Sequence, residues 1–283
     1  MAESISVNAN EFRLLRDLLE KICGIALGDE KAYLVETRLA GLLAEAGCND
    51  FGSFYRLVSS DSQHQLRDKI VDAMTTNETL WLRDGHPFTI LQEKLLPQLA
   101  DELRAGNRFR IRIWSGACST GQEPYSLAMT IQEFCRRQAG ISPDQFEIIA
   151  TDISPSALFL AKLGRYDQAA ISRGLPTDLR DRYFHQQGQV WAVDDCLKRL
   201  ITFKKFNLQD SLDPLGHFDI VFMRYVTIYF SDTFKQKIYG DVARLLAPSG
   251  HLVISAVESL RGISENFVQL SHAGGSYYRC QMS

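Results

Sequence analysis

Hydrophobic residues in the first third of the chain recur at helical spacing. Phe12, Leu15 and Leu19 fall three or four positions apart, and Gly24 follows as a stop signal. The same spacing predicts further helices over about 31–46, 51–58 and 66–74. Because no strand-like alternation interrupts these stretches, the pattern predicts a small all-α helical domain, which we place at residues 1–76.

The pattern changes after a further helical stretch over about 87–105, which Pro97 should break or restart. Segments with the alternation or the buried apolar run of a strand now follow one another, each separated by a helical stretch: RFRIRIWS, FEIIATDIS, LITFKKFNL, HFDIVFMRY and HLVISAV. Strands that alternate with helices favour a mostly parallel sheet covered on both faces. The sequence therefore predicts a second, α/β domain over residues 77–283.

Charge and cysteine content restrict the classes of partner. The net charge is -3, so no overall basic field would attract nucleic acid. No apolar run approaches the ~20 residues that span a bilayer, which predicts no membrane insertion. The six cysteines form no CxxC pair and no zinc-ligand spacing. We therefore expect no metal site, and unpaired thiols in a reducing cytoplasm.

The turn after the first predicted strand is rich in small residues. It reads GACSTG and starts with Gly116 and Ala117, so a ligand could approach the backbone closely. A tight turn without a ligand explains this composition equally well. No Lys-Ser/Thr pair follows Gly121, so the turn is not a nucleotide-binding P-loop.

Asp152 stands at the tip of the second predicted strand. A carboxylate there suits a ribose diol, because it can accept two hydroxyl hydrogen bonds. The competing role is a helix N-cap, but Ser154 followed by Pro155 already fills that role. Turn and acid together fit both a nicotinamide enzyme and a methyltransferase.

Three segments resemble the CheR-type chemoreceptor glutamate methyltransferases. TTNETLWLRD (75–84) is similar to the segment that joins the two domains in that family, and WSGACSTGQEPYS (114–126) to its cofactor loop, SxGCSTGEEPYS. FDIVFMRYVTIYF (218–230) resembles the family strand FDxIFCRNVxIYF. The similarity runs in order from the N-terminal helices to about Glu258, so it covers most of the chain.

This resemblance implies a Rossmann-like S-adenosylmethionine (SAM)-dependent methyltransferase domain with a small antiparallel β-subdomain at about 183–203. Its partners would be the cytoplasmic helices of methyl-accepting chemoreceptors, and its product S-adenosylhomocysteine (SAH). Carried over position by position, it implies cofactor contacts from Asn77, Thr79, Arg83, Gly116, Ala117, Glu123, Asp152, Asn207, Leu208, Arg224 and Tyr225.

The implied reaction esterifies a glutamate side chain, with Arg83 and Tyr229 as the catalytic pair. A carboxylate with a pKa of ~4.3 is already ionised at neutral pH, so no general base is required. The structural alternatives are a solvated Arg83–Asp84 pair and a Tyr229 that only fills the core.

Three features depart from the family pattern. Tyr225 replaces the asparagine that follows the arginine, the helix over 31–46 is weakly basic, and the stretch HQQGQ (185–189) is short. The short stretch predicts methylation that is independent of a receptor C-terminal pentapeptide. Tyr225 motivates a second hypothesis, a SAM- or SAH-binding interaction module with weak catalysis. A methyltransferase with a different substrate is the third, because a fold does not fix a substrate.

Overall fold

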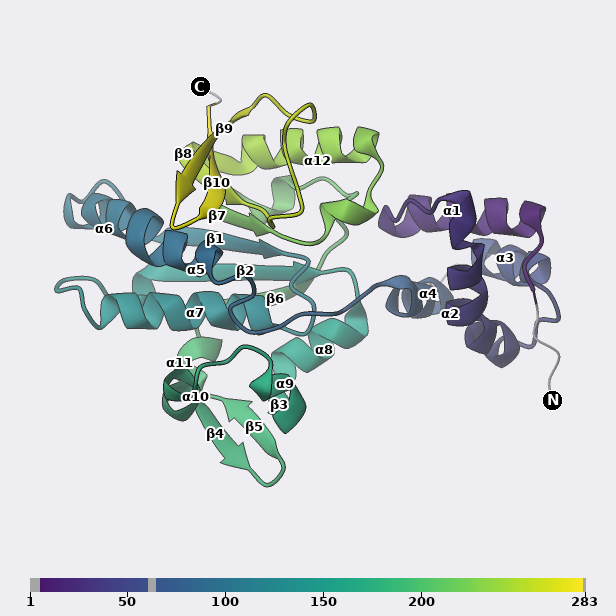
Figure 1. Cartoon of the computed structure of the whole chain (residues 1–283), viewed down its shortest axis with the longest axis horizontal. Coiled ribbons are helices and arrows are strands. Elements are labelled where there is room, and N and C mark those ends of the chain that lie inside the picture. Colours follow the sequence, from purple (N-terminus) through teal and green to yellow (C-terminus); the bar gives the residue numbers. More distant parts are fainter. Residues whose placement is uncertain (1–5, 61–64, 282–283) are drawn as a thin grey trace.

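The computed structural model describes residues 6–60 and 65–281, and it divides into a helical domain and a larger α/β domain (Figure 1). The four helices of the first part are α1 Ala9–Cys23, α2 Ala32–Glu45, α3 Phe51–Ser60 and α4 Gln65–Met74. Their bounds match the predicted helices to within a few residues. Asn8 and Glu11 form a capping box at the start of α1, and Gly24 ends it at a φ of 77°.

The helical domain has a hydrophobic core of its own. The residues that are predicted to face inward from α1 are buried here and pack with α2, α3 and α4. Met74 closes this core at the end of α4, and the chain then crosses to the second domain without regular structure over 75–80.

A seven-stranded sheet forms the centre of the second domain. Its order is β6-β2-β1-β7-β8-β10-β9. The first five strands run parallel, and β10 pairs antiparallel with both β8 and β9. The strands are β1 Ile111–Gly116, β2 Phe146–Asp152, β6 Ile201–Lys205, β7 Phe218–Met223, β8 Leu246–Val253, β9 Phe267–His272 and β10 Gly275–Cys280. This confirms the predicted mostly parallel sheet.

Helices cover both faces of the sheet, as Figure 1 shows. They are α5 His86–Ile90, α6 Leu96–Arg104, α7 Gln122–Cys135, α8 Pro155–Leu163 and α12 Asp232–Leu245. Three short helices lie beside the small antiparallel sheet instead: α9 Gln168–Ser172, α10 Thr177–Tyr183 and α11 Asp195–Lys198. A π-helical turn over Leu91–Leu95 joins α5 to α6 directly before Pro97, which lacks the N–H that a regular helix would need. Short 3-10 turns lie at Asp29–Lys31, Pro143–Gln145, Asp213–Leu215 and Thr227–Tyr229.

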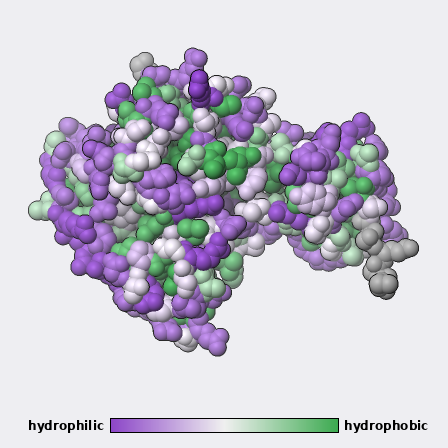
Figure 2. Space-filling model, in the orientation of Figure 1, coloured by the Kyte–Doolittle hydropathy of each residue, from purple (hydrophilic) through white to green (hydrophobic). Residues whose placement is uncertain are grey.

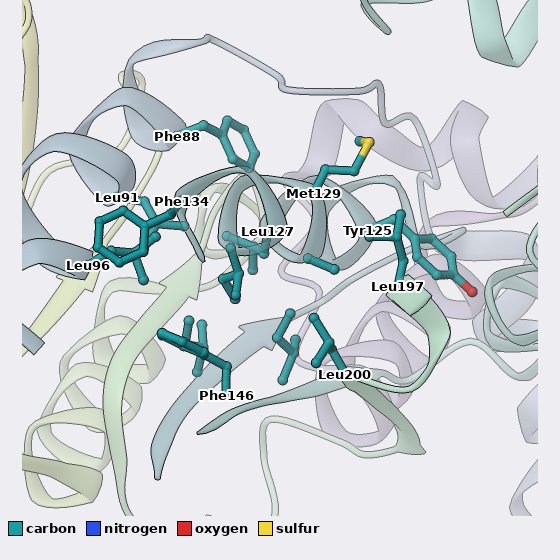
Figure 3. Packing of buried hydrophobic residues seen from close by; sticks show 14 of the residues in the cluster. Phe88, Leu91, Leu96, Tyr125, Leu127, Met129, Phe134, Phe146, Leu197 and Leu200 are labelled. Carbon is teal, nitrogen blue, oxygen red and sulfur yellow. The ribbon is translucent and has the colours of Figure 1, made fainter. Parts of the chain in front are cut away.

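Side chains that alternate along the strands pack into two separate hydrophobic cores, one on each face of the sheet. In β7, Ile220 and Phe222 join the cluster under α5 to α7, whereas Val221 and Met223 join the cluster under α12. Figure 3 shows the first cluster, in which Leu127 of α7 lies over Phe146 and Leu200 at the sheet. Burial on both faces explains why β7 is apolar from Ile220 to Met223, the part of the strand that leads to the pocket.

The small antiparallel sheet differs from its predicted range of about 183–203. It consists of β3 Arg165–Asp167, β5 Val190–Val193 and β4 Phe184–Gln187, in the order β3-β5-β4. The sheet therefore begins earlier, and Ile201–Lys205 belongs to the large sheet, where it pairs with β2. The strand Val190–Val193 is the central one of the three.

Candidate active site

A pocket opens at the carboxyl ends of the parallel strands, against the helical domain. The chain order of the strands reverses between β1 and β7, the position at which open α/β sheets bind ligands. The space measures about 1290 Å³ with its open mouth included. Ile25, Leu34 and Arg38 of the helical domain also line it, so both domains form its wall.

Most of the predicted site residues line this one pocket. They are Asn77, Thr79, Arg83, Ala117, Glu123, Asp152, Asn207, Leu208, Arg224, Tyr225 and Tyr229. Gly116 is the exception: it ends β1 beside the pocket but is not part of its lining. The three segments that carried the resemblance thus meet in space.

The turn after β1 needs glycine for packing as well as for access. A Cβ on Gly121 would lie 2.9 Å from the Tyr166 hydroxyl and 3.0 Å from the Cβ of Ala161. Its φ of 98° is also one that other residues rarely adopt. Ala117 and Ser119 have φ values of 59° and 50°, which turn their backbone toward the end of β2.

Asp152 is a buried carboxylate held by two backbone groups. It accepts the Ser119 N–H at 2.7 Å and the Ser154 N–H at 2.9 Å, while 6% of its surface is exposed. Burial raises the pKa of this carboxyl, and the backbone hydrogen bonds oppose that rise. Ser154 caps α8 by accepting the Ala157 N–H, so Asp152 is not the cap of that helix. Its oxygens retain acceptor capacity toward the pocket.

An ion network around the buried Arg224 forms part of the pocket wall. Arg224, whose side chain is 1% exposed, lies 2.8 Å from Glu123 and 2.8 Å from Asp84. Ser115 donates a further hydrogen bond to Glu123 at 2.8 Å. Within the described residues, the Nε of Arg224 has no hydrogen-bond partner although it is buried. A buried donor without a partner at a pocket wall suits an anionic ligand group.

Arg83 and Asp84 do not form the solvated pair that was the structural alternative. The Arg83 guanidinium stacks on the Tyr225 ring, 3.4 Å from its centroid, and donates to the Glu78 carbonyl at 3.0 Å. Asp84 instead accepts from Arg224 and from the Tyr225 hydroxyl. Burial, followed by the hydrogen bond to Asp84, raises the pKa of the Tyr225 hydroxyl, which keeps it protonated as a donor.

Tyr229 is not core filling either. Its side chain lines the pocket with 38% of the residue exposed, and its carbonyl accepts the Ala26 N–H of the helical domain at 2.9 Å. Asn207 also reaches that domain, because its Nδ2 donates to the Ile22 carbonyl at 2.8 Å. Asn77 is held through its carbonyl, which accepts the Ser119 hydroxyl at 3.1 Å.

The sequence reasoning missed two acidic residues at this site. Asp84 stood in a motif but was not assigned a role, although it joins Arg224 to Tyr225. Glu258 accepts the backbone N–H groups of Tyr225 and Thr227, each at 3.0 Å, and so shapes the loop after β7. An acidic residue directly after the last predicted parallel strand was the available signal for Glu258.

Neither metal clusters nor membrane-spanning helices occur in the part of the chain that the structure describes. Over 6–60 and 65–281, no three His, Cys, Asp or Glu side chains gather as a metal site. Over the same residues, no helix is long and apolar enough to cross a membrane. All six cysteines lie within the described ranges and are free thiols.

Two family models match the chain in succession. One describes the all-alpha domain of CheR methyltransferases and matches residues 10–75, and the other describes their SAM-binding domain and matches residues 77–274. The chain belongs to the CheR methyltransferase family. It is therefore a SAM-dependent methyltransferase of chemotaxis.

Relatives along nearly the whole length support this assignment. The chain is 43% identical over 277 residues to a chemotaxis protein methyltransferase of Vibrio anguillarum, with 98% of each chain covered. It is 42% identical over 272 residues to chemotaxis protein methyltransferase 1 of Pseudomonas aeruginosa, covering 96% of this chain and 98% of the relative. The chemotaxis protein methyltransferase of Escherichia coli is 33% identical over 276 residues, with 95% and 89% covered.

Proposed function

We propose that this CheR methyltransferase esterifies glutamate side chains of chemoreceptor cytoplasmic helices. The observation that carries the proposal is the meeting of Arg83 and Tyr229 at one pocket with the buried carboxylate of Asp152. SAM, when bound, supplies an electrophilic methyl group. An ionised acceptor carboxylate needs alignment and desolvation rather than a base, which fits a pocket built from an arginine and a tyrosine.

The pocket residues fit the chemical groups of SAM. Asp152 has acceptor capacity left for ribose hydroxyls, and Asn207 with Leu208 would flank the adenine. Glu123 and Arg224 carry opposite charges for the amino and carboxylate groups of the methionine part. Asn77 and Thr79 would close the cofactor in from the interdomain segment.

Arg83 and Tyr229 would act on the acceptor. Both lie at the pocket wall with side chains that are not buried, so an incoming glutamate can reach them. The Arg83 guanidinium would hold the carboxylate, and the Tyr229 hydroxyl would donate a hydrogen bond that orients one of its oxygens. Holding one oxygen leaves the other to attack in line.

The rim of the pocket suits an amphipathic helix. Tyr229 lines the pocket with an exposed side chain, and the exposed Ile228 precedes it in the chain. Val257, also exposed, adjoins the Glu258 that binds the loop after β7. Figure 2 shows hydrophobic surface near the middle of the face that it displays, beside the junction with the helical domain. A receptor helix could lay its apolar side here while its glutamate enters the pocket.

We further propose that no receptor pentapeptide is needed. Strands β4 and β5 are joined only by Gly188 and Gln189, and the central place of β5 leaves β3 and β4 as the two edges. A peptide that adds to an edge needs pockets for its alternate side chains as well as a free strand. A two-residue turn provides no wall for such pockets. We also propose a cytoplasmic location, a domain division at 76/77, and no nucleic-acid partner.

A methyl-ester assay tests the proposed function. The purified chain is incubated with SAM labelled in its methyl group and with membranes that contain receptors, and volatile methanol is measured after alkaline treatment. Base-labile label in the receptor supports glutamate esterification. SAH binding without any transfer would favour the weakly catalytic module instead. Label that is stable to base, or in another protein, would favour a different acceptor.

A further inference from the structure

Strained backbone gathers where the segment 82–84 meets the end of β7. Leu82, Asp84 and Tyr225 have φ values of 49°, 71° and 58°, in the left-handed region that non-glycine residues rarely occupy. Asparagine and aspartate tolerate this region better than a bulky residue does. Leu82 and Tyr225 are therefore less expected there than Asp84, and such strain persists only where surrounding contacts hold it.

Contacts on both sides hold Tyr225 in place. Its backbone N–H donates to the Glu258 carboxylate at 3.0 Å, and the next two N–H groups donate to the same carboxylate at 3.2 Å and 3.0 Å. Its hydroxyl donates to both oxygens of Asp84 at 2.9 Å and 3.0 Å. The ring is thus fixed at its base by one carboxylate and at its tip by another.

The fixed ring carries the Arg83 guanidinium on its face. The guanidinium carbon lies 3.4 Å from the ring centroid, and the guanidinium also donates a hydrogen bond to the Glu78 carbonyl at 3.0 Å. An arginine has many rotamers, and each immobilised side chain of this kind costs free energy when an acceptor is bound. Stacking on a rigid ring removes most of that cost beforehand.

We propose that Tyr225 is a positioning residue that holds Arg83 in the orientation required to receive the acceptor carboxylate. This inference rests on the proposed function, because it takes Arg83 as the group that meets the acceptor. The absence of the family asparagine suggested a weakly catalytic module, and this inference reverses that expectation. An asparagine has no ring on which a guanidinium could stack. Tyr225 then supports turnover in this chain rather than weakening it.

Three variants of Tyr225 separate the ring from the hydroxyl and from the cofactor. Tyr225→Leu removes both ring and hydroxyl, Tyr225→Phe keeps the ring, and Tyr225→Asn restores the family residue. We expect Tyr225→Leu and Tyr225→Asn to lower kcat by about three- to thirtyfold, the range of a partly desolvated cation–π contact. Tyr225→Phe should stay within about threefold of the wild type. The dissociation constant for SAH, measured by calorimetry on the same samples, should change less than about threefold in all three.

A double-mutant cycle with Arg83→Ala tests whether Tyr225 acts through Arg83. In the Arg83→Ala background, Tyr225→Leu should cost less than about twofold in kcat, because the side chain that it positions is gone. Equal losses for the leucine and phenylalanine variants, parallel loss of SAH affinity, or additive effects in the cycle would overturn the inference. The same ring series can be run with whichever acceptor the wild type methylates. If the wild type does not esterify glutamate, the proposed function fails, whereas the positioning role of Tyr225 is still tested by this series.

Discussion

Asp152 accepts the backbone N–H of Ser119 over 2.7 Å, which joins the tip of β2 to the turn after β1. The two neighbouring parallel strands thereby present one carboxylate and one small-residue turn at the same point of the pocket. This arrangement suits a ribose, because the carboxylate can accept hydrogen bonds from its hydroxyls and the small residues of the turn leave room for the sugar.

Substitution of Asp152 should weaken cofactor binding without unfolding the chain. We expect Asp152→Asn to raise the dissociation constant for SAH about ten- to a hundredfold, because a hydrogen bond to a charged group contributes ~1.5–3 kcal/mol. Asp219→Asn is the matched control, since Asp219 is also buried but lies at the opposite end of β7. Calorimetry should find normal SAH affinity for that control, and an unaltered affinity for Asp152→Asn would exclude the ribose role.

The two proposed catalytic residues should affect turnover rather than binding. Arg83→Ala and Tyr229→Phe are expected to lower kcat at least about tenfold, because each removes a donor that orients the acceptor. SAH affinity should fall by a smaller factor than kcat. Steady-state kinetics on receptor membranes, together with calorimetry, separate the two effects, and wild-type turnover in both variants would disprove the assignment.

Much of the fold could be predicted because its signals are local. The helices α1 to α4 follow from apolar spacing, and the parallel strands from buried runs between helices. Strand β3 was missed because it has three residues and pairs with β5 far along the chain, which no local pattern encodes. The hairpin β9–β10 was also missed, although AGG (273–275) between alternating segments is a turn signal.

The candidate site was predictable in its members but not in its connections. Motifs placed Arg83, Arg224 and Tyr225 together, yet their spacing in the sequence could not tell which pairs would touch. The stacking of Arg83 on Tyr225 depends on the left-handed backbone at position 225, which the Glu258 carboxylate stabilises from 33 residues away. Such a contact follows from tertiary structure rather than from any local preference.

A receptor-tail peptide should not bind measurably. We expect no heat in calorimetry at micromolar peptide, because the turn of Gly188 and Gln189 builds no pocket beside β4. Methylation of a receptor that lacks its C-terminal tail should then proceed at the rate of the intact receptor. Micromolar or tighter binding would restore a tethered mode of recognition.

Receptor docking should depend only modestly on salt. On α2, Arg38 donates to the Met74 carbonyl and to Thr76, so its charge is turned toward the interdomain segment. Few cations of that helix remain to be screened. We expect KM for the receptor to change less than about threefold between low and physiological ionic strength. A steep rise with salt would indicate a basic docking face elsewhere.

His251 should make the protein sensitive to mild acid. Burial and the neighbouring Arg279 lower the pKa of His251 from 6.5 to about 4. As the pH falls, His251 is protonated in the unfolded chain before it is protonated in the folded chain. The contribution of neutral His251 to the free energy of unfolding is therefore fully present above about pH 6.5 and is lost as the pH falls toward 4. The wild type should lose free energy of unfolding as the pH falls from about 6.5 to 5. We expect His251→Gln to remove up to about 2 kcal/mol of that loss.

Urea unfolding at several pH values measures this effect. The exposed His217→Gln serves as the control and should retain the wild-type pH dependence. If His251→Gln and the wild type lose stability in parallel on acidification, His251 is not the responsible group.

Mass spectrometry of the reacted receptor tests the central claim most directly. A receptor cytoplasmic fragment is incubated with the chain and SAM, digested, and mapped residue by residue. The account predicts a gain of one methylene mass on glutamate residues, which is reversed by alkali and forms at least about tenfold more slowly with Arg83→Ala. Methylation confined to lysine, arginine or a backbone terminus, or mass gains that survive alkali, would contradict it.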